Sequence, residues 1–197
     1  MRVLVAMDSF KGSVSSEVAN RAVASGVATV CPDADITCIP LADGGEGTVN
    51  TLVRALDGRL VEREVHGPLG EKVVATYGIT KDGKTAIIEI AAACGLTLIP
   101  EEERNPLQAT SYGVGELILD AMGQGCREFI IGLGGSATTD AGVGMLQALG
   151  FEFLDREGNE GGKGGVALHA IEQIETENAH PLLEECNFQM AGDVQND

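Results

Sequence analysis

A turn rich in glycine and hydroxyl side chains, Gly134–Gly142, is the stretch of this chain best suited to hold a small ligand. It follows the apolar run Phe129–Leu133, which is typical of a strand, and precedes Val143–Leu149, which has a helical pattern. Small residues let a ligand approach the backbone, and N–H groups at a helix start carry partial positive charge. The turn therefore predicts a site for a phosphate or a carboxylate. Its candidate binding residues are Gly134, Gly135, Ser136 and Thr138.

The same turn has a second interpretation, in which it only caps a helix. Ser136 and Thr138 would then satisfy backbone donors and bind no ligand. Neither of the standard nucleotide motifs is met, because the sequence has no Gly-x-x-x-x-Gly-Lys-Ser/Thr and no Gly-x-Gly-x-x-Gly here. The turn taken alone leaves both interpretations open.

Three further loops also follow predicted strands: residues 8–13, 43–48 and 192–197. Open α/β sheets bind their ligands at the carboxyl ends of parallel strands, so we expect these loops and the glycine turn to meet at one edge of a sheet. Turns that only contact solvent, and share no ligand, would have no reason to lie together at one edge of the sheet. The candidate ligand contacts in the first two of these loops are Ser9, Gly12, Gly44 and Gly45.

Four charged residues of these loops suit phosphoryl-transfer chemistry. Lys11 has the reach to pair with a carboxylate or a phosphoryl group. Asp43 and Glu46 suit magnesium, which prefers one or two carboxylates together with substrate oxygens and water. Asp193, at a strand end, is the candidate that orients or deprotonates an attacking hydroxyl. A solvated lysine and ordinary Asp-Gly turn chemistry remain the alternatives for Lys11 and Asp43.

The order of the elements predicts an α/β protein. Strand and helix patterns alternate over residues 2–7, 18–30, 36–39 and 49–56, which is the order of a parallel sheet. Residues 60–65, 73–79 and 85–90 then predict three strands with short links, the second link being an Asp-Gly hairpin turn. We expect a Rossmann-like parallel sheet flanked by helices, with an added antiparallel β meander.

These patterns also give a division into domains. Residues 1–59, 92–150 and 185–197 are assigned to the Rossmann-like core, residues 60–91 to the antiparallel extension, and residues 151–184 to the start of a second sub-domain. A parallel sheet that ends on a strand-to-helix loop lacks a covering helix. We therefore expect a core that is incomplete at its C-terminus, in a truncated sequence.

The charge of the chain argues against a nucleic-acid partner. The formal net charge is −17, and the 13 Lys and Arg residues are scattered, so no basic stripe is available for a phosphate backbone. An acidic protein that binds an anionic metabolite needs local devices such as helix starts, a few placed cations and a divalent metal ion. A metal-bridged small ligand fits this composition.

Cysteine usage and hydropathy indicate a cytoplasmic protein. The five cysteines are far apart, odd in number and lack a Cys-x-x-Cys pair, so neither a zinc ribbon nor a disulfide framework is expected. The N-terminal apolar run ends at Asp8, and no later run approaches the length of a membrane span. We expect no membrane partner, and a homo-oligomer is left open.

Five motifs in series resemble the type I glycerate kinase family. They are Asp8–Ser13, Ala42–Thr48, Glu103–Pro106, Thr110–Glu116 and Gly134–Gly144, and they run in order across nearly the whole chain. The final segment, Ala191–Asp197, is similar to a family segment that usually reads Cys-Asp-Val-x-Asn-Pro. Gly192 stands in place of that Cys and Asp197 in place of that Pro. The chain resembles the N-terminal half of the family's length.

This resemblance implies an activity and its ligands. The family transfers the γ-phosphoryl group of ATP to D-glycerate with Mg²⁺, usually giving 2-phosphoglycerate, on a two-domain α/β fold with a cleft. We therefore expect ATP, Mg²⁺ and D-glycerate as ligands of this chain, with Lys11 and Asp193 in the catalytic roles. Two alternatives are a truncated, non-catalytic fragment and a dinucleotide-binding oxidoreductase domain. The latter needs an acidic residue at the end of the second strand, where Ile39–Leu41 offers none.

Overall fold

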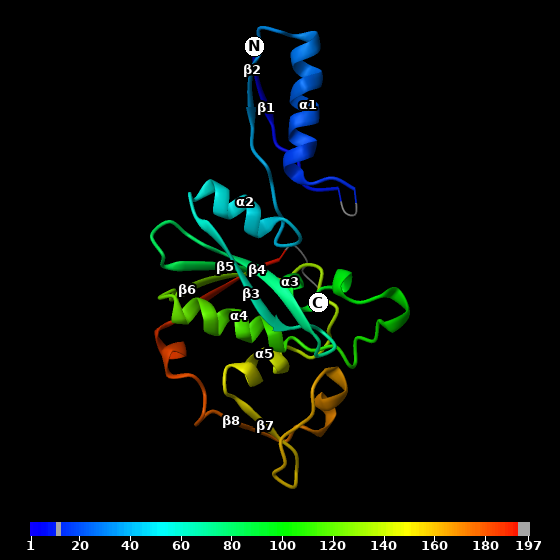
Figure 1. The fold of residues 1–197 in the computed structure, drawn as a ribbon, viewed down its shortest axis with the longest axis vertical. Coiled ribbons are helices and arrows are strands. Elements are labelled where there is room, and N and C mark those ends of the chain that lie inside the picture. Colours follow the sequence, from blue (N-terminus) through cyan, green and yellow to red (C-terminus); the bar gives the residue numbers. More distant parts are fainter. Residues whose placement is uncertain (11–12, 193–197) are drawn as a thin grey trace.

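The computed structural model describes residues 1–10 and 13–192, and its centre is a five-stranded mixed sheet with helices on both faces (Figure 1). The strand order is β3-β4-β5-β6-β9. The first three strands are antiparallel neighbours, whereas β5, β6 and β9 run parallel. The strands are β3 (Arg59–His66), β4 (Lys72–Ile79), β5 (Thr85–Glu89), β6 (Glu128–Gly132) and β9 (Asn187–Ala191). This confirms the expected α/β class and the antiparallel meander.

Both faces of the central strand β5 are covered, which explains its unbroken apolar sequence. Ile87 packs with Val49 and Val53 of helix α2 (Thr48–Ala55) on one face. Ala86 and Ile88 point the other way, because side chains alternate along a strand, and join the large cluster under helix α4 (Tyr112–Gly123). The short helices α3 (Ala91–Cys94) and α5 (Val143–Ala148) complete that second layer.

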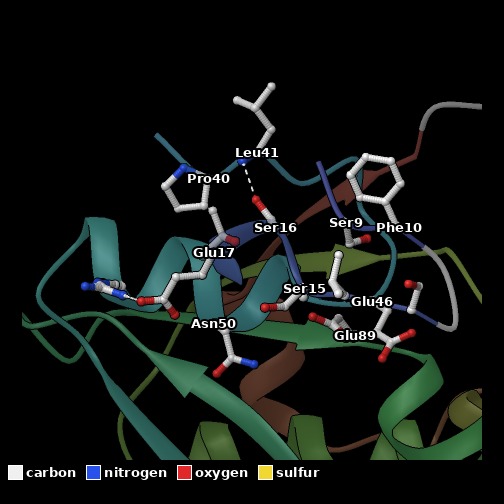
Figure 2. Close-up of a pocket in the computed structure, with 15 residues that line it drawn as sticks. Ser9, Phe10, Ser15, Ser16, Glu17, Pro40, Leu41, Glu46, Asn50 and Glu89 are labelled. Atoms are coloured by element: carbon white, nitrogen blue, oxygen red, sulfur yellow. Dashed lines mark hydrogen bonds and ion pairs between the residues drawn. The ribbon is translucent and has the colours of Figure 1, made fainter. Parts of the chain in front are cut away.

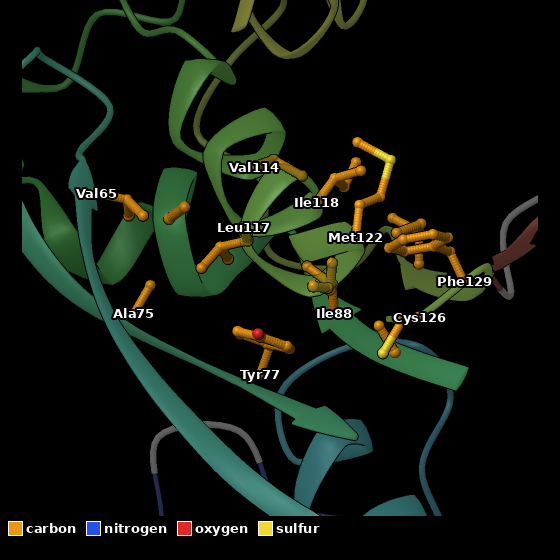
Figure 3. Packing of buried hydrophobic residues seen from close by; sticks show 14 of the residues in the cluster. Val65, Ala75, Tyr77, Ile88, Val114, Leu117, Ile118, Met122, Cys126 and Phe129 are labelled. Carbon is orange, nitrogen blue, oxygen red and sulfur yellow. The ribbon is translucent and has the colours of Figure 1, made fainter. Parts of the chain in front are cut away.

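The main hydrophobic core lies between the sheet and α4 (Figure 3). Leu117 and Phe129 are fully buried there, and so is Tyr77, whose hydroxyl donates to Asp120 Oδ2 at 2.6 Å. Arg63 Nε donates to the other oxygen of Asp120 at 2.6 Å. The Tyr77 hydroxyl is therefore hydrogen-bonded at the rim of this core.

Residues 1–10 and 13–41 form a unit that projects from the main body, and we call this unit the N-terminal arm (Figure 1). It contains β1 (Arg2–Val5), α1 (Ser16–Val30) and β2 (Asp35–Cys38), and β1 pairs in parallel with β2. Within the described residues neither strand joins the five-stranded sheet.

This differs from the expected sheet, in which the strands of residues 1–59 continue into the sheet of residues 92–150. The apolar run of β5 pairs with that of β6 instead, over Thr85 to Glu89, and so the meander belongs to the same sheet as β6. Hydrophobic periodicity reports that a strand is buried and does not report which strand lies next to it. The domain division given above remains a prediction.

The segment between α5 and β9 forms a small antiparallel pair of its own. Strands β7 (Glu152–Leu154) and β8 (Gln173–Glu175) pair with each other. The remaining elements are four 3₁₀ helices: η1 (Leu96–Leu98), η2 (Glu101–Glu103), η3 (Gly165–Ala170) and η4 (Pro181–Glu185). None of the helices within residues 1–10 and 13–192 combines the length and the apolar character that a membrane-spanning helix needs.

Candidate active site

Three of the predicted loops meet at the carboxyl edge of the parallel strands. The backbone carbonyl of Gly44 accepts a hydrogen bond from Gly134 N at 3.2 Å. A Cβ on Gly134 would lie 2.6 Å from Gly45 Cα, and a Cβ on Gly44 would collide with the carbonyl of Ala191. Glycine is required here because the end of β6, the end of β9 and the loop of residues 43–47 touch through their backbones. The loop reaches this edge even though β2, which precedes it, belongs to another sheet.

Three of the predicted site residues lie outside the described residues. These are Lys11, Gly12 and Asp193. Phe10, which directly precedes Lys11, and Ser9 both line the pocket described next. Gly192 ends the described part of the last loop, beside Leu133.

A pocket of about 610 Å³, which we call the polar pocket, lies between the arm and the body (Figure 2). Ser9, Ser13 and Ser15 line it from the arm, and Glu46 and Asn50 line it from the start of α2 and the preceding loop. Helix α1 begins at this wall because the Ser15 hydroxyl caps it, accepting from Val18 N at 3.4 Å. The pocket thus presents hydroxyl, amide and carboxylate groups together.

Glu89 is a pocket residue that the sequence analysis missed. It ends β5, and its carboxylate reaches the first turn of α2, where Oε1 accepts a hydrogen bond from Val49 N at 2.7 Å. Burial raises the pKa of the Glu89 carboxyl, the charge of nearby Glu46 adds to the rise, and the α2 amides oppose it. The available signal was a lone acidic residue that interrupts the apolar run Ala86–Ile90 at a strand end.

Asp43 and Glu46, the predicted metal ligands, have different surroundings. Asp43 Oδ1 accepts from Gly45 N at 2.9 Å, which fixes the turn, and Asp43 is absent from the described lining of the polar pocket. Glu46 lines that pocket together with Glu89 (Figure 2). Among residues 1–10 and 13–192 no group of three or more His, Cys, Asp or Glu side chains is arranged to hold a metal ion. A cation there would need further oxygens from its ligand or from water.

The glycine turn, Gly134–Gly142, uses much of its hydrogen-bonding capacity internally. Ser136 Oγ accepts from Thr138 N at 3.2 Å. The hydroxyl of Thr138 donates to Ala109 O at 2.6 Å and accepts from Asp140 N at 3.0 Å. Both side chains therefore satisfy backbone groups, as the capping interpretation requires, while Gly134 and Gly135 bring the backbone close to its neighbours.

Asp140 is the centre of this turn. It is buried, and its Oδ2 accepts from Ser111 N at 2.7 Å, from Ser111 Oγ at 2.9 Å and from Gly144 N at 3.2 Å. Oδ1 accepts from Gly142 N at 3.1 Å. One internal carboxylate thus occupies the starts of both α4 and α5, and the start of α5 is the one for which the sequence predicts an anion site.

A second pocket, of about 550 Å³, lies on the other side of the end of β5. We call it the apolar pocket, because side chains such as Ile131, Leu133, Met145 and Met190 form most of its wall. Ser136 and Thr138 line it as well. Glu89 lines the polar pocket, and the next residue along the chain, Ile90, lines the apolar one.

Comparisons with known proteins agree on one family. The model of the glycerate kinase family matches residues 3–197. Over 196 residues the chain is 50% identical to a glycerate kinase of Haemophilus influenzae and 48% identical to a glycerate 2-kinase of Escherichia coli. Both alignments cover 100% of this chain, and they cover 52% and 51% of those proteins respectively.

A solved structure shows the same likeness. The crystal structure of a protein proposed to be glycerate kinase 2 from Salmonella typhimurium LT2 superposes with a TM-score of 0.85 at 45% identity, covering 100% of this chain and 53% of the other. The chain spans about half the length of the curated relatives it matches. With a family model matched over nearly all of its residues, the chain belongs to the glycerate kinase family.

Proposed function

We propose that this chain carries the site for ATP-dependent phosphorylation of D-glycerate, with 2-phosphoglycerate as the product. The observation that supports this most is the meeting of the Gly44–Gly45 loop with the end of β6 beside a pocket that holds both hydroxyls and carboxylates. Relatives named glycerate kinase share about half of its residues. Phosphoryl transfer needs positioned reactants and charge neutralisation, and it needs little covalent chemistry from the protein.

The polar pocket is the proposed place for the hydroxy acid and the end of the triphosphate. Ser9, Asn50 and the backbone of the loop of residues 43–47 offer hydrogen bonds to hydroxyl and phosphate oxygens. Lys11 would pair with one of the anionic groups, and Asp193 would orient or deprotonate the attacking hydroxyl. The support for Lys11 is its position in the chain two residues after Ser9, and for Asp193 its position next to Gly192 at the same edge.

The donor set of the polar pocket fits Mg²⁺. The carboxylate side chains Glu46 and Glu89 both line this pocket, and Asp43 lies three residues before Glu46 in the same loop. One or two carboxylates suffice for Mg²⁺ when phosphate oxygens and water supply the other ligands. We propose Glu46 as one ligand, with Asp43 or Glu89 as the second. When bound, the ion would neutralise the charge of the phosphate groups.

The glycine turn would contribute shape more than side-chain contacts. Gly134 and Gly135 are proposed to let a ligand approach the backbone, whereas Ser136 and Thr138 hold the turn in its conformation. Gly12 and Gly45 are proposed to leave room in the same way for the glycerate or the phosphate groups. The cytoplasm is the compartment that we propose for this reaction.

An assay of ADP release by this chain, with and without D-glycerate and Mg²⁺, tests the proposal. We expect release that depends on both, and an ¹H–³¹P correlation spectrum that shows the phosphate on the 2-hydroxyl. The proposal would be wrong if purified chain released no glycerate-dependent ADP while the Haemophilus influenzae relative did so in the same assay. That outcome would favour a non-catalytic fragment, and NADH binding in a titration would favour the oxidoreductase alternative.

A further inference from the structure

The apolar pocket has no role in the function proposed so far. It is lined by residues from α3, α4, β6, the glycine turn, α5 and β9. Its volume of about 550 Å³ falls within the range of roughly 300–1,000 Å³ typical of small-molecule sites. It also lies at the carboxyl ends of two adjacent parallel strands, β6 and β9, where open α/β sheets bind ligands.

The polar atoms around this pocket are already engaged by the protein. The Thr138 hydroxyl bonds to Ala109 O and Asp140 N, and the Thr139 hydroxyl donates to Pro106 O at 3.1 Å. The Ser111 hydroxyl donates to Asp140 and accepts from Met145 N at 2.9 Å. These side chains therefore have little left to offer an anion.

The pocket also carries no free charge within its described lining. The Asp140 carboxylate is buried and accepts four hydrogen bonds, as given above. Burial raises the pKa of the Cys94 thiol to about 12, so that this side chain is neutral at physiological pH. The interior thus suits an uncharged, weakly polar group, and it does not suit a phosphate or a carboxylate.

From this division of chemistry we infer that the apolar pocket takes the purine base of ATP, and that the polar pocket takes the phosphates and glycerate. The inference rests on the proposed function. A nucleoside triphosphate has one apolar end and one highly charged end. This chain has a pocket of each character, with Glu89 in the lining of the polar pocket and its neighbour Ile90 in the lining of the apolar pocket.

Calorimetric titration of the full chain with Mg·ATP and with Mg·tripolyphosphate, which lacks the base and the ribose, tests this inference. Leu133 and Met190 line the apolar pocket and are 45% and 57% exposed, so Leu133→Gln and Met190→Gln remove apolar contact with little risk to the fold. Neutral glutamine adds no charge that could act on the phosphates. Val74→Gln is the matched control, since Val74 is 67% exposed on β4 and lines neither pocket.

We expect the Leu133→Gln, Met190→Gln double variant to bind Mg·ATP about tenfold more weakly, since a tenfold change is about 1.4 kcal/mol, close to the value of one buried apolar side chain. Its affinity for Mg·tripolyphosphate should stay within twofold of the wild type, roughly the scatter of such measurements. The control should change neither affinity. An equal loss of affinity for both ligands, or no loss for either, would overturn the assignment of the base to the apolar pocket. Binding of Mg·ATP by the wild type would in that case still support the proposed kinase function. A wild-type chain that bound no ATP would overturn both.

Discussion

The interactions that stabilise the body differ in kind from those that stabilise the N-terminal arm. The body has a continuous hydrophobic cluster whose members are buried almost completely, from Val65 to Leu149. None of the described hydrophobic clusters contains a residue of the arm. The arm leaves several of its apolar side chains exposed, among them Leu4 at 63% and Val30 at 80%. A parallel pair of strands with so little cover gains little from the hydrophobic effect.

The arm is instead closed by a small polar network at its base. The Asn20 side chain donates to Ser16 O at 2.7 Å and to Met7 O at 3.1 Å, and accepts from Met7 N at 3.2 Å. The Ser16 hydroxyl donates to Met7 O and accepts from Leu41 N. These bonds join the start of α1 to the chain leaving β1 and β2. The polar pocket therefore has one wall supported by a core and one wall supported by a few hydrogen bonds.

The largest expected effect comes from the core of the body. Leu117→Ala should lower the free energy of unfolding by about 2–5 kcal/mol, because it leaves a cavity under the sheet. Urea denaturation followed by circular dichroism measures this change. Val74→Ala on the exposed face of β4 is the control and should have little effect. A small loss for Leu117→Ala would show that the body is less tightly packed than its burial indicates.

A smaller and local effect is expected in the arm. Asn20→Ala removes the partners of buried backbone groups, at a cost of about 1–3 kcal/mol for the groups left unsatisfied. Hydrogen exchange should become faster at Ile39 N, which bonds across the arm to Val5 O, and stay unchanged in β6. Thr29→Ala on the exposed side of α1 is the control. Equal acceleration in the arm and in β6 would mean that the two regions unfold together.

The smallest effect concerns the polar rim of the core. Burial of the Asp120 carboxyl opposes its ionisation, but the hydrogen bonds from Arg63, Tyr77 and Gln124 prevail and hold its pKa below the usual value of 3.8. A lowered pKa in the folded state means that Asp120 stabilises the protein above that value, and that this contribution is lost as the pH falls through the folded-state pKa. Asp120→Asn should therefore unfold at a lower temperature than the wild type at pH 7.

The difference between Asp120→Asn and the wild type should shrink in strongly acidic buffer, and thermal scans over a pH series measure it. Glu62→Asn on the exposed part of β3 should show no such trend. A constant difference at every pH would assign the effect of Asp120 to packing rather than to charge.

The sequence predicted the elements well where local signals were strong. The expected Asp-Gly turn joins β4 to β5, and the strand predicted over residues 73–79 is observed as β4, Lys72–Ile79. The βαβ order correctly predicted the parallel pairing of β1 with β2. Their separation from the five-stranded sheet was not predictable, because strand pairing depends on contacts between distant segments. The role of Asp140 was hidden for the same reason, since its partner Ser111 lies 29 residues away.

The candidate site was predictable in its glycines and less so in its side chains. Gly44 and Gly134 indicated close backbone approach, and the structure places them in contact. Glu89 was missed because a single acidic residue at the end of a strand carries no spacing signal. The roles of Lys11, Asp43, Glu46 and Asp193 remain proposals that mutagenesis can test.

The buried carboxylate of Asp140 has one more consequence, which concerns competing solutes. Free phosphate and sulfate ions can bind to the N-terminus of a helix whose backbone N–H groups have no other partner. Here the starts of α4 and α5 already bind a carboxylate of the protein itself. A free inorganic anion would have to displace that side chain, which is tethered to the backbone, before it could reach either helix.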